Sequence, residues 1–230
     1  MAKTCSTCHA KLGMFHSGPL ICKACETRLG AVESQIAEAL ADDILTPAEE
    51  SGVDRLIEQG GFTWTDVATH NHPLVERFIV AKANDGRLET MPNAALLTSA
   101  GEIVHLETPA AVMTEQVLRE FKGGSRGVSV PIGHGVRVRT GNFRGHSVVV
   151  GTQTVASDTG TMTISSKRLV FAGNKSTIEI PLAKLIDVKA FTDGVQIHAS
   201  NRKAAPLFRT TVSGIVVAAT IAAARRALPS

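Results

Sequence analysis

The amino-acid sequence predicts a multi-domain α+β protein built from three units. These are a small unit organised by four cysteines, a short helical module, and an antiparallel β-barrel or sandwich capped by a C-terminal helix. Three observations predict this order: the cysteines lie within the first 25 residues, apolar residues then recur at helical spacing, and short strand-like segments separated by glycine follow residue 92. We place the domain boundaries at 1–28, 29–92 and 93–230.

The composition supports a globular chain with an uneven charge distribution. Of the 230 residues, 43% are apolar and 20% are charged, which excludes wholesale disorder and a fibre. The net charge of +3 combines +3 for residues 1–28, −8 for residues 29–92 and +8 for residues 93–230. Blocks of opposite sign favour separate folding units and a protein partner, whereas a basic unit can also meet phosphates or an anionic membrane.

The sequence contains no recognisable targeting or membrane-spanning segment. Its start is polar and lacks the apolar core of a signal peptide. The longest apolar run, Val212 to Ala224, has 13 residues, and a membrane-spanning helix needs about 20. We therefore expect a soluble cytoplasmic protein with reduced thiols, which would be peripheral at the inner membrane surface if the basic unit binds lipid.

The cysteines form two matched pairs, Cys5-Ser-Thr-Cys8 and Cys22-Lys-Ala-Cys25, with 13 residues between them. Two intervening residues let both sulfurs of a pair reach one ion, and four thiolates complete a tetrahedral shell. A full thiolate shell leaves no position for a catalytic water. The pattern therefore predicts one structural zinc ion, with metal binding supplying the folding free energy of this short unit.

Alternatives to zinc remain open from the residues alone. Two disulfides or a redox dithiol would use the same cysteines, but the missing signal peptide and the paired doublets argue against both. His9 and His16 lie nearby and could replace a ligand, although four thiols suffice. The sequence also predicts apolar packing around the site by Leu12, Met14, Phe15, Leu20 and Ile21.

The two cysteine pairs give residues 3–28 a resemblance to a zinc ribbon. Cys5-Ser-Thr-Cys8-His-Ala-Lys-Leu-Gly13 is similar to the first knuckle of short bacterial ribbons, and Cys22-Lys-Ala-Cys25 to the second. The resemblance implies a metal and a fold and leaves the role open. Some ribbons bind nucleic acid, but four basic residues and the single aromatic Phe15 make a weak footprint for it.

The acidic middle segment shows helical signals. Apolar residues recur from Val32 to Leu40, Thr46-Pro47 marks a helix start, and Gly60-Gly61 marks its end. We predict a third helix from about Pro73 to Ala83, preceded by a loop containing His70 and His72. The stretch 36–57 resembles the SHOCT-type helical pair of bacterial proteins, which implies a module for interaction or oligomerisation.

After residue 92 the sequence predicts many short strands. The expected strands are 102–108, 111–118, 127–132, 135–140, 146–155, 160–165, 168–172, 176–180, 185–191 and 194–199. Asp193-Gly194 is the strongest hairpin signal, and Asp158-Thr-Gly160 is a predicted turn. A single helix over about 211–228 would close the open end of the barrel and protect its edges.

This half of the chain resembles a bacterial PH-like domain, a member of the pleckstrin-homology superfold. The resemblance covers about residues 95–228 and is best over 157–200, where Thr161-Met-Thr-Ile-Ser-Ser-Lys167-Arg168-Leu-Val-Phe171 is similar to the family signature. We name five basic residues as candidate ligand or partner contacts. They lie in connections between strands: Lys167, Arg168, Lys184, Arg202 and Lys203.

No pattern of catalytic residues supports an enzyme. Gly123-Gly-Ser125-Arg-Gly127 matches the spacing of a nucleophile elbow, but a strand rather than a helix is expected after it. We therefore predict a non-enzymatic cytoplasmic adaptor that binds a protein partner or self-associates. Anionic lipid binding by the basic unit and nucleic-acid binding by the ribbon are the alternatives.

Overall fold

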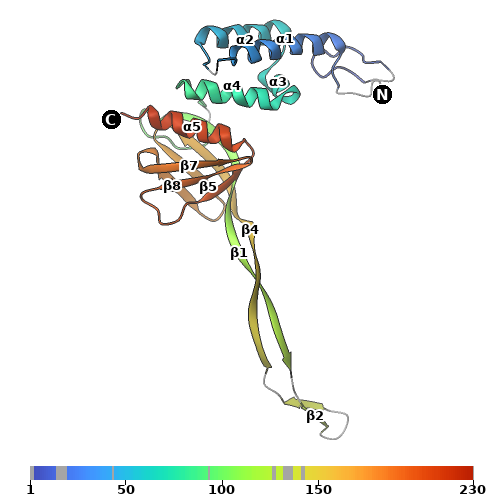
Figure 1. Ribbon diagram of the computed structural model, residues 1–230, viewed down its shortest axis with the longest axis vertical. Helices are drawn as coiled ribbons and strands as arrows, with labels where there is room; N and C mark the ends of the chain where they lie inside the picture. Colours follow the sequence, from blue (N-terminus) through green and yellow to red (C-terminus); the bar gives the residue numbers. More distant parts are fainter. Residues whose placement is uncertain are drawn as a thin grey trace.

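The computed structural model describes residues 3–13, 20–42, 44–92, 94–125, 128–131, 137–140 and 143–229, with the backbone alone between residues 117 and 152. Figure 1 shows the N-terminal helices at one end, a curled sheet with the C-terminal helix in the middle, and a long ribbon leaving the sheet on the side away from the N-terminal helices. The cysteine cluster lies beside the first helix at the N-terminal end.

The N-terminal helices share one apolar core. They are α1 (Lys23–Ala39), α2 (Pro47–Gly60), α3 (Trp64–His70) and α4 (His72–Asn84). Their inward side chains recur at spacings of three and four and form a single cluster: Leu29, Val32, Ile36, Val53, Ile57, Val67, Val75 and Phe78. Phe62, in the connection between α2 and α3, belongs to the same cluster. Cys5 and Cys25 belong to the same cluster, so the cysteine site is packed onto the helical core.

Local signals in the sequence place the ends of α2 correctly. Thr46 forms a capping box, because its hydroxyl accepts the Glu49 N–H at 3.3 Å while the Glu49 carboxylate accepts the Thr46 N–H at 2.8 Å. At the other end Gly61 adopts the left-handed conformation, with φ of 69°. That conformation favours glycine and ends the helix as predicted.

Two features of this region differ from the prediction. α1 begins at Lys23 rather than near Gly30, so the predicted boundary after residue 28 falls inside a helix. A short helix, α3, occupies the expected loop before α4. It is started by a second capping box between Thr63 and Asp66, a signal too short to show helical periodicity.

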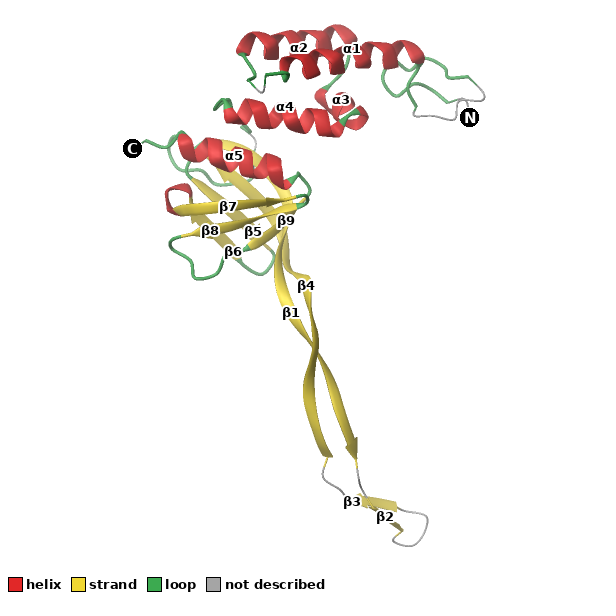
Figure 2. Cartoon of the chain, viewed as in Figure 1, coloured by secondary structure: helices red, strands yellow, loops and turns green. Residues whose placement is uncertain are grey.

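The second half of the chain is an antiparallel curled sheet, a half-barrel, with a C-terminal helix. Its strands are β1 (Val104–Ser125), β4 (Phe143–Ser165), β5 (Arg168–Gly173), β6 (Thr177–Pro181), β7 (Leu185–Phe191), β8 (Gly194–Ala199) and β9 (Leu207–Thr210). Their order is β6-β5-β4-β1-β9-β8-β7. The short helix η1 (Leu182–Lys184) links β6 to β7, and α5 (Gly214–Arg226) covers the sheet as predicted (Figure 2).

The core of this half lies between the concave face of the sheet and α5. Phe171 and Phe208 meet there with ring centroids 5.5 Å apart. Gly194 is required by close packing, because a Cβ atom at that position would lie 2.0 Å from the Phe208 carbonyl oxygen. The β7–β8 hairpin is confirmed, although its two loop residues are Thr192 and Asp193, with Gly194 already in the strand.

The structure has two long strands where four shorter ones were predicted from the sequence. β1 replaces the predicted strands 102–108 and 111–118, and β4 replaces 146–155 and 160–165. Pro109 does not interrupt β1, because pairing with β9 begins only at Ala110. Asp158 is not in a turn: it lies in β4, and its carboxylate accepts the Lys175 and Ser176 N–H groups that close the β5–β6 connection.

Beyond the sheet, β1 and β4 continue as a ribbon paired only with each other among the described residues. Two short strands, β2 (Val128–Pro131) and β3 (Arg137–Thr140), pair at its far end. The helical and sheet units meet where α4 lies against α5 (Figure 1). There the Arg226 guanidinium donates to the Ala83 and Asn84 carbonyls at the end of α4.

Candidate metal centre

The first cysteine pair lies on a tight loop between two short extended segments. Thr4 and Lys11 form an isolated antiparallel bridge, which brings the two sides of the loop together. Inside it, the Cys5 N–H donates to the Ala10 carbonyl at 2.8 Å and the Cys5 carbonyl accepts the His9 N–H at 3.0 Å. His9 takes a positive φ of 58°, which lets the chain reverse directly after Cys8.

The second pair lies at the start of α1 rather than on a second loop. Cys22 is the N-cap residue and Cys25 lies in the first helical turn, so their side chains are three residues apart on one helix face. The N-terminal end of a helix carries a partial positive charge, which favours thiolates there. The predicted second knuckle is therefore provided by a helix.

The four sulfurs form one compact group. All four Sγ atoms lie within 4.8 Å of one another, and Cys8 Sγ and Cys22 Sγ are 3.5 Å apart. A tetrahedral zinc site with Zn–S bonds of about 2.3 Å has sulfur–sulfur separations of about 3.8 Å. All four thiols are free of disulfide bonds. The cluster can therefore bind a metal ion, and its size and donor set fit zinc.

Hydrogen bonds and burial shift the pKa values of three of the thiols in different directions. Burial raises the pKa of Cys5, but N–H donation from Cys8, Cys22 and Thr7 outweighs it and lowers the pKa to about 6. N–H donation from Cys25 likewise lowers the pKa of Cys22. Burial, followed by contact with the other three sulfurs, raises the pKa of Cys25 to about 12. The metal-free cluster thus retains a proton that a bound cation would displace.

Arg28 is a residue of this centre that the sequence reasoning missed. One guanidinium nitrogen donates to Cys25 Sγ at 3.3 Å and the other to the Gly60 carbonyl at 3.3 Å. The same group lies 5.7 Å from the centroid of the Phe62 ring. Arg28 therefore ties the sulfur cluster to the end of α2. Its position three residues after Cys25 on a helix was the available signal.

The predicted surroundings of the cluster are only partly confirmed. Leu12 and Ile21 pack against the helical core, whereas Leu20 is 50% exposed and was wrongly predicted to cover the site. Met14, Phe15 and His16 lie outside the described residues. In the described part of the chain, His70 and His72 do not belong to any group of three donors close enough to hold a metal ion. His70 instead pairs with Glu33 at 2.7 Å, and His72 pairs with Glu76 at 3.5 Å.

Two of the five candidate basic residues are held by interactions within the fold. Arg168 donates to the Glu102 carboxylate at 2.9 Å, to Glu179 at 3.1 Å and to the Leu97 carbonyl at 2.9 Å. Lys167 donates to the Ala100 carbonyl at 2.8 Å. Both side chains thus fasten the segment before β1 onto the β4–β5 turn, which reduces their capacity to bind another molecule.

The other three candidate basic residues differ in the contacts that they make within the fold. The Arg202 guanidinium donates to the Glu179 carbonyl at 3.4 Å, which brings it near the residue that pairs with Arg168. Lys184 and Lys203 are exposed. Their proposed contact with a ligand or partner stays a prediction.

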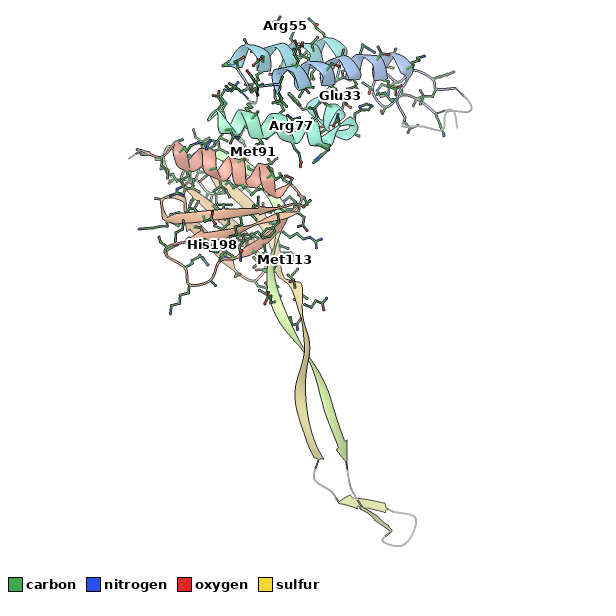
Figure 3. The ribbon with its side chains drawn as sticks, in the orientation of Figure 1. Glu33, Arg55, Arg77, Met91, Met113 and His198 are labelled. Carbon is green, nitrogen blue, oxygen red and sulfur yellow. The ribbon has the colours of Figure 1, made fainter. Side chains whose placement is uncertain are left out.

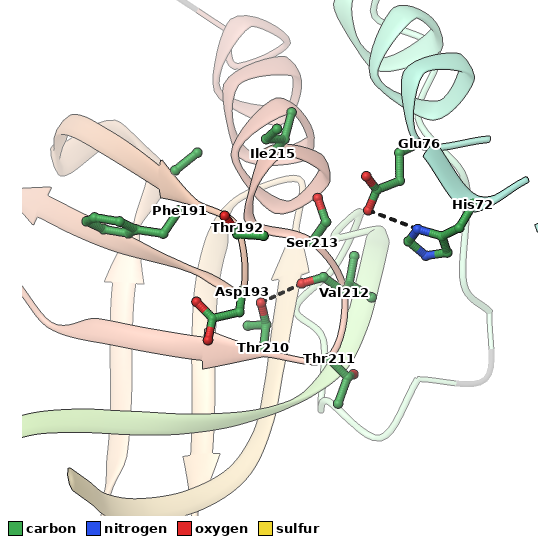
Figure 4. A pocket seen from close by; sticks show the side chains of 11 residues that line it. His72, Glu76, Phe191, Thr192, Asp193, Thr210, Thr211, Val212, Ser213 and Ile215 are labelled. Carbon is green, nitrogen blue, oxygen red and sulfur yellow. Dashed lines mark hydrogen bonds and ion pairs between the residues drawn. The ribbon is translucent and has the colours of Figure 1, made fainter. Parts of the chain in front are cut away.

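The boundary between the two units contains three cavities, the smallest of which, about 430 Å³, lies between α4 and Ile215 of α5. One, of about 800 Å³, lies between the start of α4, the β7–β8 turn and the start of α5, with His72, Phe191 and Ile215 in its wall (Figure 4). The second, of about 750 Å³, is mainly apolar and is lined by Trp64, Leu106 and Val216, with other residues.

Comparison with other proteins gives no family assignment. No family model matches the chain, and no curated protein sequence matches it significantly. No helix in the described ranges is both long enough and apolar enough to cross a membrane.

Proposed function

We propose that the chain is a non-enzymatic, zinc-binding interaction protein of the reducing cytoplasm, and that one structural zinc ion fixes its N-terminal unit. The observation that carries this proposal is the convergence of four Sγ atoms within 4.8 Å. Two of these cysteines are fully buried in the helical core. A metal there would hold the first loop against α1 and so stabilise the surface that the helices present to a partner.

Other features support the proposed identity of the two larger units. Seven antiparallel strands, the last of which returns beside the first and leads into a closing helix, agree with a PH-like domain over residues 93–230. The helix start at Thr46 agrees with a SHOCT-like pair within residues 29–92. Zinc ribbons, SHOCT modules and PH-like domains all serve binding roles, which favours an adaptor that engages a protein partner or a second copy.

Elemental analysis of the untagged full chain tests the metal. We expect one zinc per chain, and we expect cobalt substitution to give the visible absorption of a tetrahedral tetrathiolate site. C8S and C25S should each lower the zinc content, whereas H9A, which changes a neighbouring side chain outside the sulfur cluster, should leave it unchanged. Full-length protein without stoichiometric zinc, or zinc retained in C25S, would contradict the proposal.

The adaptor role needs a separate measurement. Affinity capture from the native cell should recover a partner with the wild-type chain and lose it with the C5S/C25S variant. H9A is the matched control and should keep the partner. Capture that is equal for all three chains would show that the metal unit has no part in binding.

A further inference from the structure

The apolar cavity of about 750 Å³ between the helical unit and the sheet is a feature that the proposed function does not use. Its volume falls within the range of about 300–1,000 Å³ that is typical of small-molecule sites. The wall combines residues from α2, α3 and α4 with residues from the connection before β1, from β1 and from α5. Met91, which lies in that connection and lines the cavity, is labelled at the boundary between the units in Figure 3. The contact between the two units therefore forms the cavity.

Much of the wall is made of apolar side chains that the fold shields from bulk solvent. The Trp64 and Phe78 rings contact each other, with their centroids 4.9 Å apart and their planes tilted by 34°. Phe78 and Val216 are only 3% and 4% exposed, although both border the cavity. An apolar wall of this kind takes up the hydrocarbon part of a ligand, because the contact removes apolar surface of both molecules from water.

The cationic side chains in the wall already have carboxylate partners. Lys82 Nζ lies 2.7 Å from a Glu50 carboxylate oxygen and also pairs with Glu89. Arg87 pairs with the same Glu50 carboxylate and donates to Asp85 at 2.8 Å. An anionic ligand would have to compete with these carboxylates for Lys82 and Arg87. The wall therefore does not favour a ligand that carries a carboxylate or a phosphate group.

The unused polar groups in the wall are hydrogen-bond acceptors. Trp64 Nε1 donates to one Asp54 carboxylate oxygen at 3.1 Å, and no cation among the described residues pairs with Asp54. His105 Nδ1 lies 2.8 Å from the Glu89 carbonyl oxygen, which can only accept a hydrogen bond. Nδ1 therefore carries the ring proton, and Nε2 of the neutral ring is left as an acceptor. A ligand that matches this wall must bring hydrogen-bond donors.

We propose that the cavity binds a small amine that carries an apolar chain or ring. The hydrocarbon part packs against Trp64 and Val216, and the ammonium group donates to the Asp54 carboxylate. A hydrogen bond between an ammonium group and a carboxylate is about twice as strong as one between neutral groups. The carboxylates of Glu50, Asp54 and Glu89 outnumber the two cations in the wall, so the charge of the wall also favours a cationic ligand.

Intrinsic fluorescence of the full-length chain tests the proposal. Trp64 is the only tryptophan in the sequence and there is no tyrosine, so the emission reports the cavity directly. The probes are decylamine, decanol and decanoate, which share one alkyl chain and differ in the polar group. They are used below their micelle concentrations with about 0.15 M salt, which screens weak attraction to the protein surface. We expect saturable binding of decylamine, about tenfold weaker binding of decanol, and the weakest binding of decanoate.

Substitutions inside and outside the wall locate the binding. D54N keeps an oxygen for the Trp64 N–H but removes the charge, so it should weaken decylamine binding about tenfold and leave decanol binding unchanged. V216F fills part of the cavity and should weaken the binding of every probe. E58Q is the matched control, because it removes an exposed carboxylate from the same helix outside the cavity wall; it should bind like the wild type. Circular dichroism should show that each variant is folded, and D54N decides the outcome if V216F is not.

Absence of saturable decylamine binding overturns the proposal. Equal affinity for decylamine and decanol also overturns it, and would assign a neutral apolar ligand to the cavity. Tighter binding of decanoate would overturn it by showing that Lys82 or Arg87 leaves its carboxylate partner for an anion. Decylamine binding that D54N leaves unchanged would place the amine elsewhere on the protein. All of these variants keep the four cysteines and zinc content is measured separately, so failure here leaves the metal proposal standing.

Discussion

Replacement of Arg168 by methionine tests whether this residue is structural rather than a ligand contact. The Glu102 side chain is fully buried and accepts hydrogen bonds from Arg168 at 2.9 Å and from Ser165 at 2.6 Å. R168M keeps the length of the side chain but removes the only cation paired with this carboxylate in the described part of the chain. A buried charge without its partner is strongly unfavourable.

The expected loss is about 3–5 kcal/mol in the free energy of unfolding, measured by urea denaturation of the full chain at neutral pH. Donation from Arg168, Ser165 and Ser99 overcomes the effect of burial and lowers the pKa of Glu102 from 4.5 to about 2. The largest of these lowering effects comes from Arg168, so R168M should raise the pKa of Glu102 toward its ordinary range.

The sign of the pH dependence follows from the lowered pKa. The contribution of Glu102 is fully present above about pH 4.5, where the unfolded carboxyl is ionised, and it is lost as the pH falls toward 2. In R168M this part of the acid sensitivity should shrink. K167M is the control, because the exposed Lys167 should cost less than about 1 kcal/mol. Equal losses in R168M and K167M would refute the structural role.

Two further substitutions test packing and the contact between units. G194A should destabilise the sheet by more than about 2 kcal/mol in thermal or urea unfolding, because its Cβ would lie 2.0 Å from the Phe208 carbonyl; a neutral G194A would contradict this approach of β8 to β9. R226Q removes donation to the Ala83 and Asn84 carbonyls and should raise amide exchange at the end of α4, whereas R225Q should not.

Much of the helical region and of the metal site was predictable because short-range rules determine them. The capping box at Thr46 and the left-handed Gly61 act within one turn of chain, and the spacing of Cys5, Cys8, Cys22 and Cys25 specifies a donor set. The helix that provides the second pair was missed. Cys22 and Cys25 precede the first clear apolar periodicity of α1, so nothing nearby in the sequence indicated a helix start.

The features that sequence reasoning missed depend on long-range pairing. Glu102 and Arg168 are separated by 66 residues. The sequence therefore could not show whether Arg168 is an exposed cation or one that neutralises a buried carboxylate. The length of β1 and β4 was also missed, because it depends on pairing between distant parts of the chain. Pro109 and Asp158 are both residue types that favour turns. Pro109 nevertheless fits within β1, because it lacks an N–H group and pairing with β9 begins only at the next residue. Asp158 fits within β4, because its carboxylate accepts a hydrogen bond from the β5–β6 connection.

Metal removal should unfold one half of the molecule before the other. Cys5 and Cys25 belong to the core of α1–α4, whereas the sheet and α5 pack around a different set of side chains. Structural zinc contributes about 10–16 kcal/mol to small domains, which is comparable with the whole stability of a domain. Chelation should therefore abolish the amide protection of α1 and α2 while β5 and β8 keep theirs. Simultaneous loss in both halves would mean that the α4–α5 contact joins them into one cooperative unit, and unchanged protection would show that the sulfur cluster is not needed for the fold.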